Sequence, residues 1–141
     1  MKFKQFGTKY ILRIDKGEEI VETLKNFCTK HQIKLGSISG IGATNNATIG
    51  FFSANSKQFH KKDISEDMEI APLLGNITTM NGETYLHLHI NLGDSEHKSL
   101  SGHLNRAVCS TTFEAIIDAI DGEVDREFSE EIGLNLLKFE R

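Results

Sequence analysis

The chain has 141 residues, of which 38% are hydrophobic and 26% are charged, and this is the ordinary composition of a globular domain. We therefore expect one domain over residues 1–141. Sixteen basic and twenty acidic residues leave a formal net charge of −4, which argues against an overall basic field for binding nucleic acid. Because no apolar run approaches the roughly 18 residues of a membrane span or the core of a signal peptide, we expect a cytoplasmic protein with no membrane partner.

The first elements predicted along the chain are a strand and a helix. Tyr10, Leu12 and Ile14 alternate as the buried face of a strand would. Apolar residues at helical spacing then predict an amphipathic helix over residues 17–32, and Asp15, with Glu18 three residues later, resembles a capping pair at its start. The two cysteines, Cys28 and Cys109, are too few for a disulfide framework, and each is expected to be buried in the core.

Most of the remaining chain is predicted to be β-structure. The strongest signal is Asn81-Gly82, because both central residues of a type I′ turn need positive φ, and this turn would join strands 69–80 and 83–92 into a hairpin. The other predicted strands are 34–43, 46–53, a polar edge strand at 58–63, 107–118 and a weaker strand at 133–139. We therefore predict an α+β fold, a mostly antiparallel sheet of seven to eight strands with one main flanking helix.

Histidines form the clearest chemical pattern, since His87, His89, His97 and His103 lie within seventeen residues. On a strand, His87 and His89 point to the same face as Tyr85 and Asn91, and the leucines and isoleucine between them point to the other face. His103 follows Gly102 in a loop before the next strand. Three neutral imidazoles with an open fourth position suit zinc or another divalent first-row metal. Solvated histidines on the surface of a sheet would give the same pattern.

Carboxylates are harder to place from the sequence. Glu69, at the start of a predicted strand, is the candidate for a general acid or base, and it could also be the fourth metal ligand. His97 or a neighbouring subunit could supply that ligand instead. Glu83 and Glu114 are further candidates, and each of these glutamates could simply be a solvated charge. The glycine-rich segment 36–43 lacks the Lys-Ser/Thr ending of a phosphate-binding loop and is read as a strand with a bend.

Five short motifs together carry a family resemblance. In chain order they are Ser39-Gly-Ile-Gly-Ala43, Ile49-Gly-Phe51, Glu69-Ile-Ala-Pro-Leu-Leu-Gly-Asn-Ile77, Tyr85-Leu-His-Leu-His-Ile90 and Gly102-His-Leu104. Their order and content resemble the plant-and-prokaryote-conserved (PPC) domain family in its stand-alone prokaryotic form, and the resemblance covers roughly residues 8–140. It implies an α+β fold that assembles as a homotrimer. It also implies a metal site on His87, His89 and His103 near a subunit boundary.

Three functions are compatible with these observations. The first is a homotrimeric binding or assembly module, with a small molecule as a further ligand and a divalent metal, zinc among the candidates. The second is a metal-dependent, zinc-type enzyme acting on a small molecule, with water activated at the open position. The third is DNA binding, a label that such domains carry from relatives with an AT-hook. The Arg-Gly-Arg-Pro core of that hook is absent here, so nucleic acid is the least favoured partner.

Overall fold

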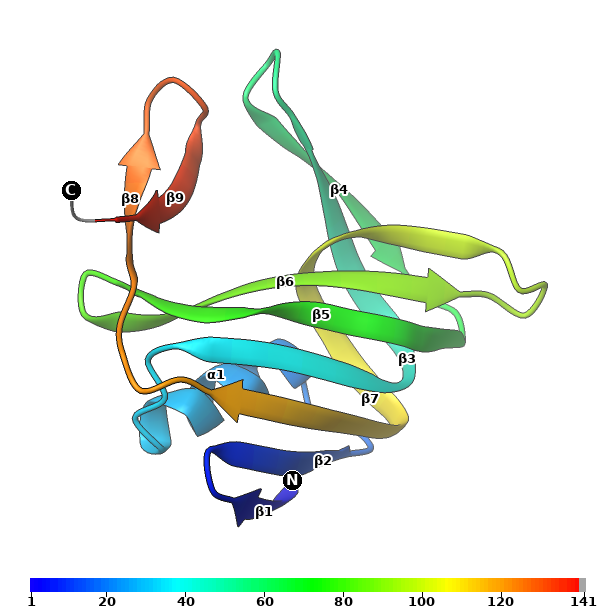
Figure 1. Ribbon diagram of the computed structural model, residues 1–141. Coiled ribbons are helices and arrows are strands. Elements are labelled where there is room, and N and C mark those ends of the chain that lie inside the picture. The colour runs from blue at the N-terminus through cyan, green and yellow to red at the C-terminus, as the bar shows by residue number, and fades with distance from the viewer. Residues whose placement is uncertain (140–141) are drawn as a thin grey trace.

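The computed structural model describes residues 1–139, and within them the chain forms one helix and nine strands (Figure 1). The elements are β1 (Lys2–Phe6), β2 (Lys9–Asp15), α1 (Ile20–Lys30), β3 (Gly36–Ser53), β4 (Gln58–Ile64), β5 (Met68–Met80), β6 (Glu83–Gly93), β7 (Ser99–Ala119), β8 (Asp125–Ser129) and β9 (Leu134–Lys138). This arrangement confirms the predicted α+β class with a mostly antiparallel sheet. In this part of the chain, no helix is long and apolar enough to cross a membrane.

Seven of the strands form one antiparallel sheet in the order β1-β2-β7-β6-β5-β3-β4. Strand β7 also pairs with β3, so β3, β5, β6 and β7 form a closed circuit of neighbours. Side chains on the inner face of these strands pack against the apolar face of α1, which buries Ile20, Leu24, Phe27 and Cys28. The strands that carry functional side chains are therefore held on both edges by other strands.

The helix is shorter than the periodicity predicts, since it covers Ile20–Lys30 and not residues 17–32. Its N-cap is Glu19, whose carboxylate accepts hydrogen bonds from the backbone N–H groups of Val21 and Glu22. One of the two hydrogen bonds expected of the predicted capping pair is present: the Glu18 carboxylate accepts a hydrogen bond from the Asp15 backbone N–H at 2.7 Å. That pair lies just outside the helix, so the helix begins later than expected.

Several strand boundaries differ from the prediction. The predicted strands 34–43 and 46–53 are one strand, β3, because β7 pairs with both halves of it across register shifts between Gly40 and Asn46. Strand β7 begins at Ser99, eight residues before the predicted start at 107. Strands β1 and β8 were not predicted. The predicted closing strand 133–139 is present as β9, but it pairs with β8 in a separate hairpin and does not join the sheet.

The predicted hairpin of β5 and β6 is confirmed. Met80 pairs with Glu83, and the two turn residues between them have positive φ, 52° at Asn81 and 79° at Gly82. The alternation along β6 is also as predicted, since Leu88, Ile90 and Leu92 are buried in the core. Cys28 and Cys109 are buried free cysteines, as expected. The hairpin of β8 and β9 projects from the same side of the molecule as the far ends of β3 and β4 (Figure 1).

Candidate metal centre

The three predicted histidines lie together on two neighbouring strands. His87 and His89 are on β6, and His103 is on β7 directly opposite His89. The prediction that His103 lies in a loop is therefore wrong, because β7 extends back past it to Ser99. Pairing of β6 with β7 brings side chains that are fourteen residues apart, His89 and His103, into adjacent positions on one face.

Two glycines allow the backbones to approach closely around these histidines. A Cβ atom added at Gly75 of β5 would lie 2.1 Å from the backbone oxygen of His87, a distance that no side chain could tolerate. A Cβ atom added at Gly102 would lie 2.6 Å from the backbone oxygen of Gly50 on β3. Both positions therefore require glycine, and both lie beside the histidine strands.

The imidazoles are arranged as ligands of one ion would be. One ring nitrogen from each histidine lies within 4.8 Å of the others, and Nε2 of His87 is 3.2 Å from Nε2 of His89. Two nitrogens bound tetrahedrally to zinc at about 2.0–2.1 Å would lie roughly 3.3 Å apart. The His87–His89 pair already has that spacing, and a ring nitrogen of His103 lies within 4.8 Å of both. Among residues 1–139, no other group of three histidines, cysteines or carboxylates is clustered in this way.

Electrostatics favour the neutral imidazoles that a metal requires. Burial, with smaller contributions from His87 and His89, lowers the pKa of His103 to about 4. The pKa of His87 is also lowered, chiefly by burial and then by the nearby His89 and the positive charge of Arg126. Both rings therefore have a free lone pair near neutral pH, without the competition from protons that weakens metal binding.

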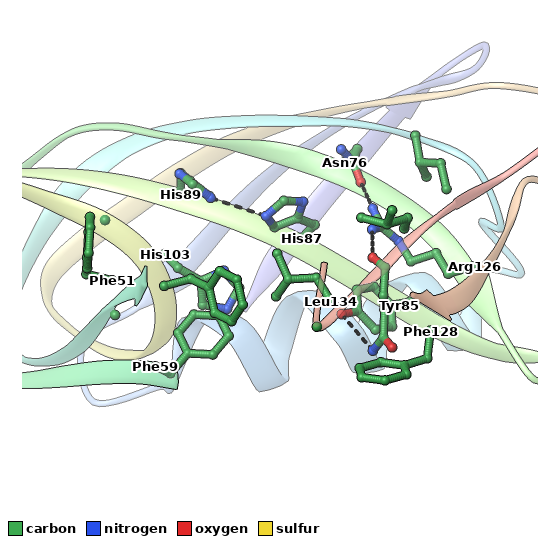
Figure 2. Close-up of a pocket in the computed structure, with 17 residues that line it drawn as sticks. Phe51, Phe59, Asn76, Tyr85, His87, His89, His103, Arg126, Phe128 and Leu134 are labelled. Carbon is green, nitrogen blue, oxygen red and sulfur yellow. Dashed lines mark hydrogen bonds between the residues drawn. The ribbon is translucent and has the colours of Figure 1, made fainter. Parts of the chain in front are cut away.

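The cluster opens into a cleft of about 720 Å³. Phe51 and Phe52 of β3 and Phe59 of β4 line one side, and Phe128 and the leucines of β9 line another. Figure 2 shows the histidines and Phe59 toward one end of this cleft, and Tyr85, Asn76 and Arg126 toward the other. The volume is within the range of small-molecule sites in proteins. An ion on the three imidazoles would therefore have an open position facing a cleft large enough for a ligand.

Sequence reasoning missed Arg126, which is only 7% exposed and lines the cleft from β8. It donates hydrogen bonds to Thr78 Oγ1, Asn76 Oδ1 and the backbone oxygen of Asn135, and its guanidinium lies 4.7 Å from the centre of the Tyr85 ring. Nothing in its local sequence signals this role, because its two side-chain partners, Thr78 and Asn76, lie about fifty residues earlier in the chain.

The other candidates lie elsewhere. Glu69 is exposed at the start of β5, opposite Gly93 and Ala43, and it lines a different hollow of the surface from the cleft. His97 is exposed in the loop between β6 and β7. Glu83 and Glu114 are also exposed and outside the cleft. Within one copy of the described chain, the histidine cluster thus has no carboxylate from this group beside it.

Most of this chain is similar to a known domain family and to proteins of known structure. Residues 1–121 match the model of the Plants and Prokaryotes Conserved (PCC) domain. A Bacteroides thetaiotaomicron protein named for a proposed DNA-binding role is 40% identical, with a TM-score of 0.97 over 99% of this chain and 98% of its own. A metal-containing protein of Archaeoglobus fulgidus is 32% identical, with a TM-score of 0.89 over 99% of this chain and 100% of its own.

Two further comparisons bear on the fold. A plant- and prokaryote-conserved protein of Pyrococcus horikoshii is 28% identical, with a TM-score of 0.87 over 99% of this chain and 96% of its own. Acetolactate decarboxylase from Bacillus subtilis is only 15% identical, with a TM-score of 0.55 over 78% of this chain and 52% of its own, and it shares the fold alone. Among proteins with curated descriptions, none matches this chain.

Proposed function

The chain belongs to the Plants and Prokaryotes Conserved domain family, and from that premise we propose that it is a self-associating module that holds one divalent metal ion on His87, His89 and His103. The observation that carries the proposal is the convergence of three ring nitrogens within 4.8 Å at the end of a cleft. A strand that is buried on one face has no packing need for histidines on its other face. Zinc is the first candidate because it binds three protein ligands and leaves its fourth coordination position to water or a substrate.

A relative supports this proposal independently of the geometry. The protein from Archaeoglobus fulgidus that shares 32% of its residues with this chain is named as metal-containing. The two proteins have the same fold, since their structures align over 99% of this chain, so a metal site in one is compatible with the backbone of the other. The donor set of three neutral nitrogens favours zinc and its first-row neighbours over calcium or magnesium, which prefer oxygen ligands.

Metal content measured by mass spectrometry tests this proposal on protein purified without a histidine tag. We expect about one zinc per chain in the wild type after incubation with zinc and gel filtration, and much less in His87→Ala. The matched control is His60→Ala, which removes an exposed histidine of β4 outside the cleft and should keep its metal. Equal metal content in His87→Ala and wild type would contradict the proposal.

The proposed assembly is a homotrimer, as the family resemblance implies. The outer face of the sheet supports self-association, because a row of paired, exposed positions crosses it with three large apolar side chains, Ile11, Ile116 and Leu74, and Ser39 between the last two. Leu74 pairs in turn with His89, so the row ends at the histidine cluster. Several exposed isoleucine and leucine side chains along one row of a sheet are typical of a surface that another protein covers.

Light scattering tests the assembly. We expect wild-type protein at micromolar concentration to have three times the mass of one chain, and Ile116→Lys to have a lower mass. Ile120→Lys is the matched control, because Ile120 is equally apolar and 57% exposed but follows the end of β7, outside the row. A monomeric wild type, or a trimer that is unaffected by Ile116→Lys, would contradict this assignment of the surface.

A metal-dependent enzyme is the second candidate function, and the cleft favours it. When bound, zinc with three protein ligands lowers the pKa of a coordinated water and polarises substrate oxygens. The cleft walls would exclude solvent, and Arg126 would orient a ligand beside the histidines. Glu69 could act as the acid or base only if a neighbouring copy supplied it, because Glu69 of the same chain lies outside the cleft.

Ester hydrolysis is a first assay of this second function. The zinc-loaded wild type should hydrolyse 4-nitrophenyl acetate faster than the metal-free protein and faster than zinc-treated His87→Ala. Equal rates in all three samples would show that the observed hydrolysis is not metal-dependent.

DNA binding is not proposed, although a 40% identical relative is named for such a role. The net charge of −4 opposes contact with a polyanion. Retention on DNA at low ionic strength, with loss at moderate salt, would overturn this judgement.

A further inference from the structure

Arg126 is a buried charge without an opposite charge beside it. Only 7% of the residue is exposed, yet it takes part in no ion pair within the described part of the chain. Its partners Thr78, Asn76 and Asn135 are neutral oxygen acceptors. Buried arginines are normally paired with carboxylates, because an uncompensated charge in a low dielectric is costly.

The guanidinium also has donors to spare. Arginine carries five N–H groups, and the hydrogen bonds to neighbouring groups occupy one on Nε, one on Nη1 and one on Nη2. One N–H therefore remains on each of Nη1 and Nη2, as far as the contacts among residues 1–139 show. These contacts and the Tyr85 ring fix the plane of the guanidinium, so the remaining donors are already oriented when a ligand arrives.

The cleft that Arg126 lines contains no acidic side chain among the residues that the structure describes. This is unusual in a chain with twenty acidic and sixteen basic residues. Arg126 and the three histidines line this same cleft. A cation bound by the histidines would make the cleft still more positive, and an anionic ligand would compensate both charges.

The spacing between the two ends limits the size of the ligand. Arg126 lies over Tyr85, which is two residues from His87 on the same face of β6, and two residues of a strand span roughly 7 Å. Phenylalanine and leucine side chains line the cleft between and around these ends. A small molecule with an apolar body could therefore contact Arg126 at one end and the histidine site at the other.

We propose that Arg126 is the anion-binding end of this cleft, and that the ligand is a small carboxylate whose apolar body carries a second oxygen donor toward the histidines. Arginine's planar fork matches a carboxylate, and the apolar walls favour an organic acid over a free inorganic anion. The contact with the histidine end rests on the proposed metal, whereas the contact with Arg126 does not. Arg126 also lies outside residues 1–121, which match the family model.

Calorimetry with a matched pair of probes tests this proposal. The probes are 4-hydroxybenzoate and its neutral isostere 4-hydroxybenzamide, each titrated into metal-free and zinc-loaded protein. We expect the carboxylate to bind at least tenfold more tightly than the amide in both forms, because a hydrogen bond to a charged group contributes more than a neutral one. Zinc should tighten binding of the carboxylate further. Inorganic phosphate is the third probe, and equal competition by phosphate would overturn the assignment to an organic carboxylate.

Arg126→Gln should remove the preference for the carboxylate, and Arg126→Lys should keep part of it. Arg106→Gln is the control, since it removes the same charge from an exposed position on β7 outside the cleft. If loss of Arg126 unfolds the β8–β9 hairpin, the Nε–H resonance of Arg126 in the wild type provides the test, and it should shift on addition of 4-hydroxybenzoate.

The outcomes separate this inference from the proposed metal function. A preference for the carboxylate that depends on Arg126, in a wild-type protein that binds no zinc, would support the anion site and refute the metal site. Zinc binding with no preference for the carboxylate, and no shift of the Arg126 resonance, would overturn the anion site and leave the metal site standing.

Discussion

The lowered pKa of His103 predicts that the metal-free protein loses stability in a defined range of pH. In the folded state the imidazole stays neutral down to about pH 4, whereas in the unfolded chain it takes up a proton near its ordinary pKa of 6.5. Below pH 6.5 the unfolded state therefore binds more protons than the folded state. The contribution of this group to stability is complete above pH 6.5, falls between pH 6.5 and 4, and changes no further below that.

The size of the effect follows from the same two values. A pKa lowered from 6.5 to about 4 corresponds to at most about 3.4 kcal/mol, at 1.36 kcal/mol per pH unit. His103 is only half-buried, so solvent screening reduces this to roughly 1–2 kcal/mol. For a chain of this length, that corresponds to a fall in Tm of roughly 3–8 °C.

Thermal denaturation of metal-free wild type and His103→Gln, between pH 8 and pH 4, measures this effect. The glutamine variant keeps a polar side chain of similar size but cannot take up a proton, so its Tm should fall less over this range. Carboxylates with lowered pKa values, such as Glu18 and Asp15, also lose stabilising contacts in acid, but they do so equally in both proteins. Parallel curves for the two proteins would show that protonation of His103 does not destabilise the fold.

Three further predictions concern backbone geometry and the thiols. Gly82→Ala should cost about 1 kcal/mol in urea unfolding, because Gly82 has a φ of 79°, and an unchanged midpoint would contradict this. Gly75→Ala should lower the free energy of unfolding by about 1–3 kcal/mol and weaken zinc binding, because the new Cβ would lie 2.1 Å from the backbone oxygen of His87. Gly93→Ala is the control, and it should do neither, because a Cβ there would have no neighbour within 4 Å. Burial raises the pKa of the Cys28 thiol to about 12, so maleimide should label it only when the protein unfolds, and rapid labelling of native protein would contradict its burial.

The strands that bury one face were predictable from the sequence. In β6 every second residue is apolar, so the placement of His87 and His89 on the outer face follows from the alternation alone. The turn at Asn81-Gly82 is a local feature, because its two residues meet the φ requirement without help from the rest of the fold. These two features are enough to predict the hairpin and two of the three histidines of the site.

Other features depend on pairing between distant segments. The first half of β7 contains serine, glycine and asparagine with little alternation, and it is a strand because β3 and β6 pair with it. Position 103 was therefore expected in a loop. In the same way, the glycines of β3 suggested a break, but register shifts allow the strand to continue. All residues of β1 are exposed, so no burial pattern marked it in the sequence.

Arg126 shows the limit of local patterns most clearly. Its hydrogen-bond partners Thr78 and Asn76 lie about fifty residues earlier in the chain, and their meeting depends on where the β8–β9 hairpin packs. A lone arginine in a short polar segment is usually solvated, and nothing nearby in the sequence distinguishes this one. Residues of every strand from β3 to β9 line the cleft, so no single stretch of the sequence marks it.

The metal site on the three histidines is tested most directly by an anomalous-difference map from crystals of zinc-loaded protein, recorded on both sides of the zinc absorption edge. We expect one strong peak per chain, about 2.0–2.1 Å from a ring nitrogen of each of His87, His89 and His103. Peaks only at other histidines, such as His60 or His97, or no peak in crystals grown with zinc, would contradict it.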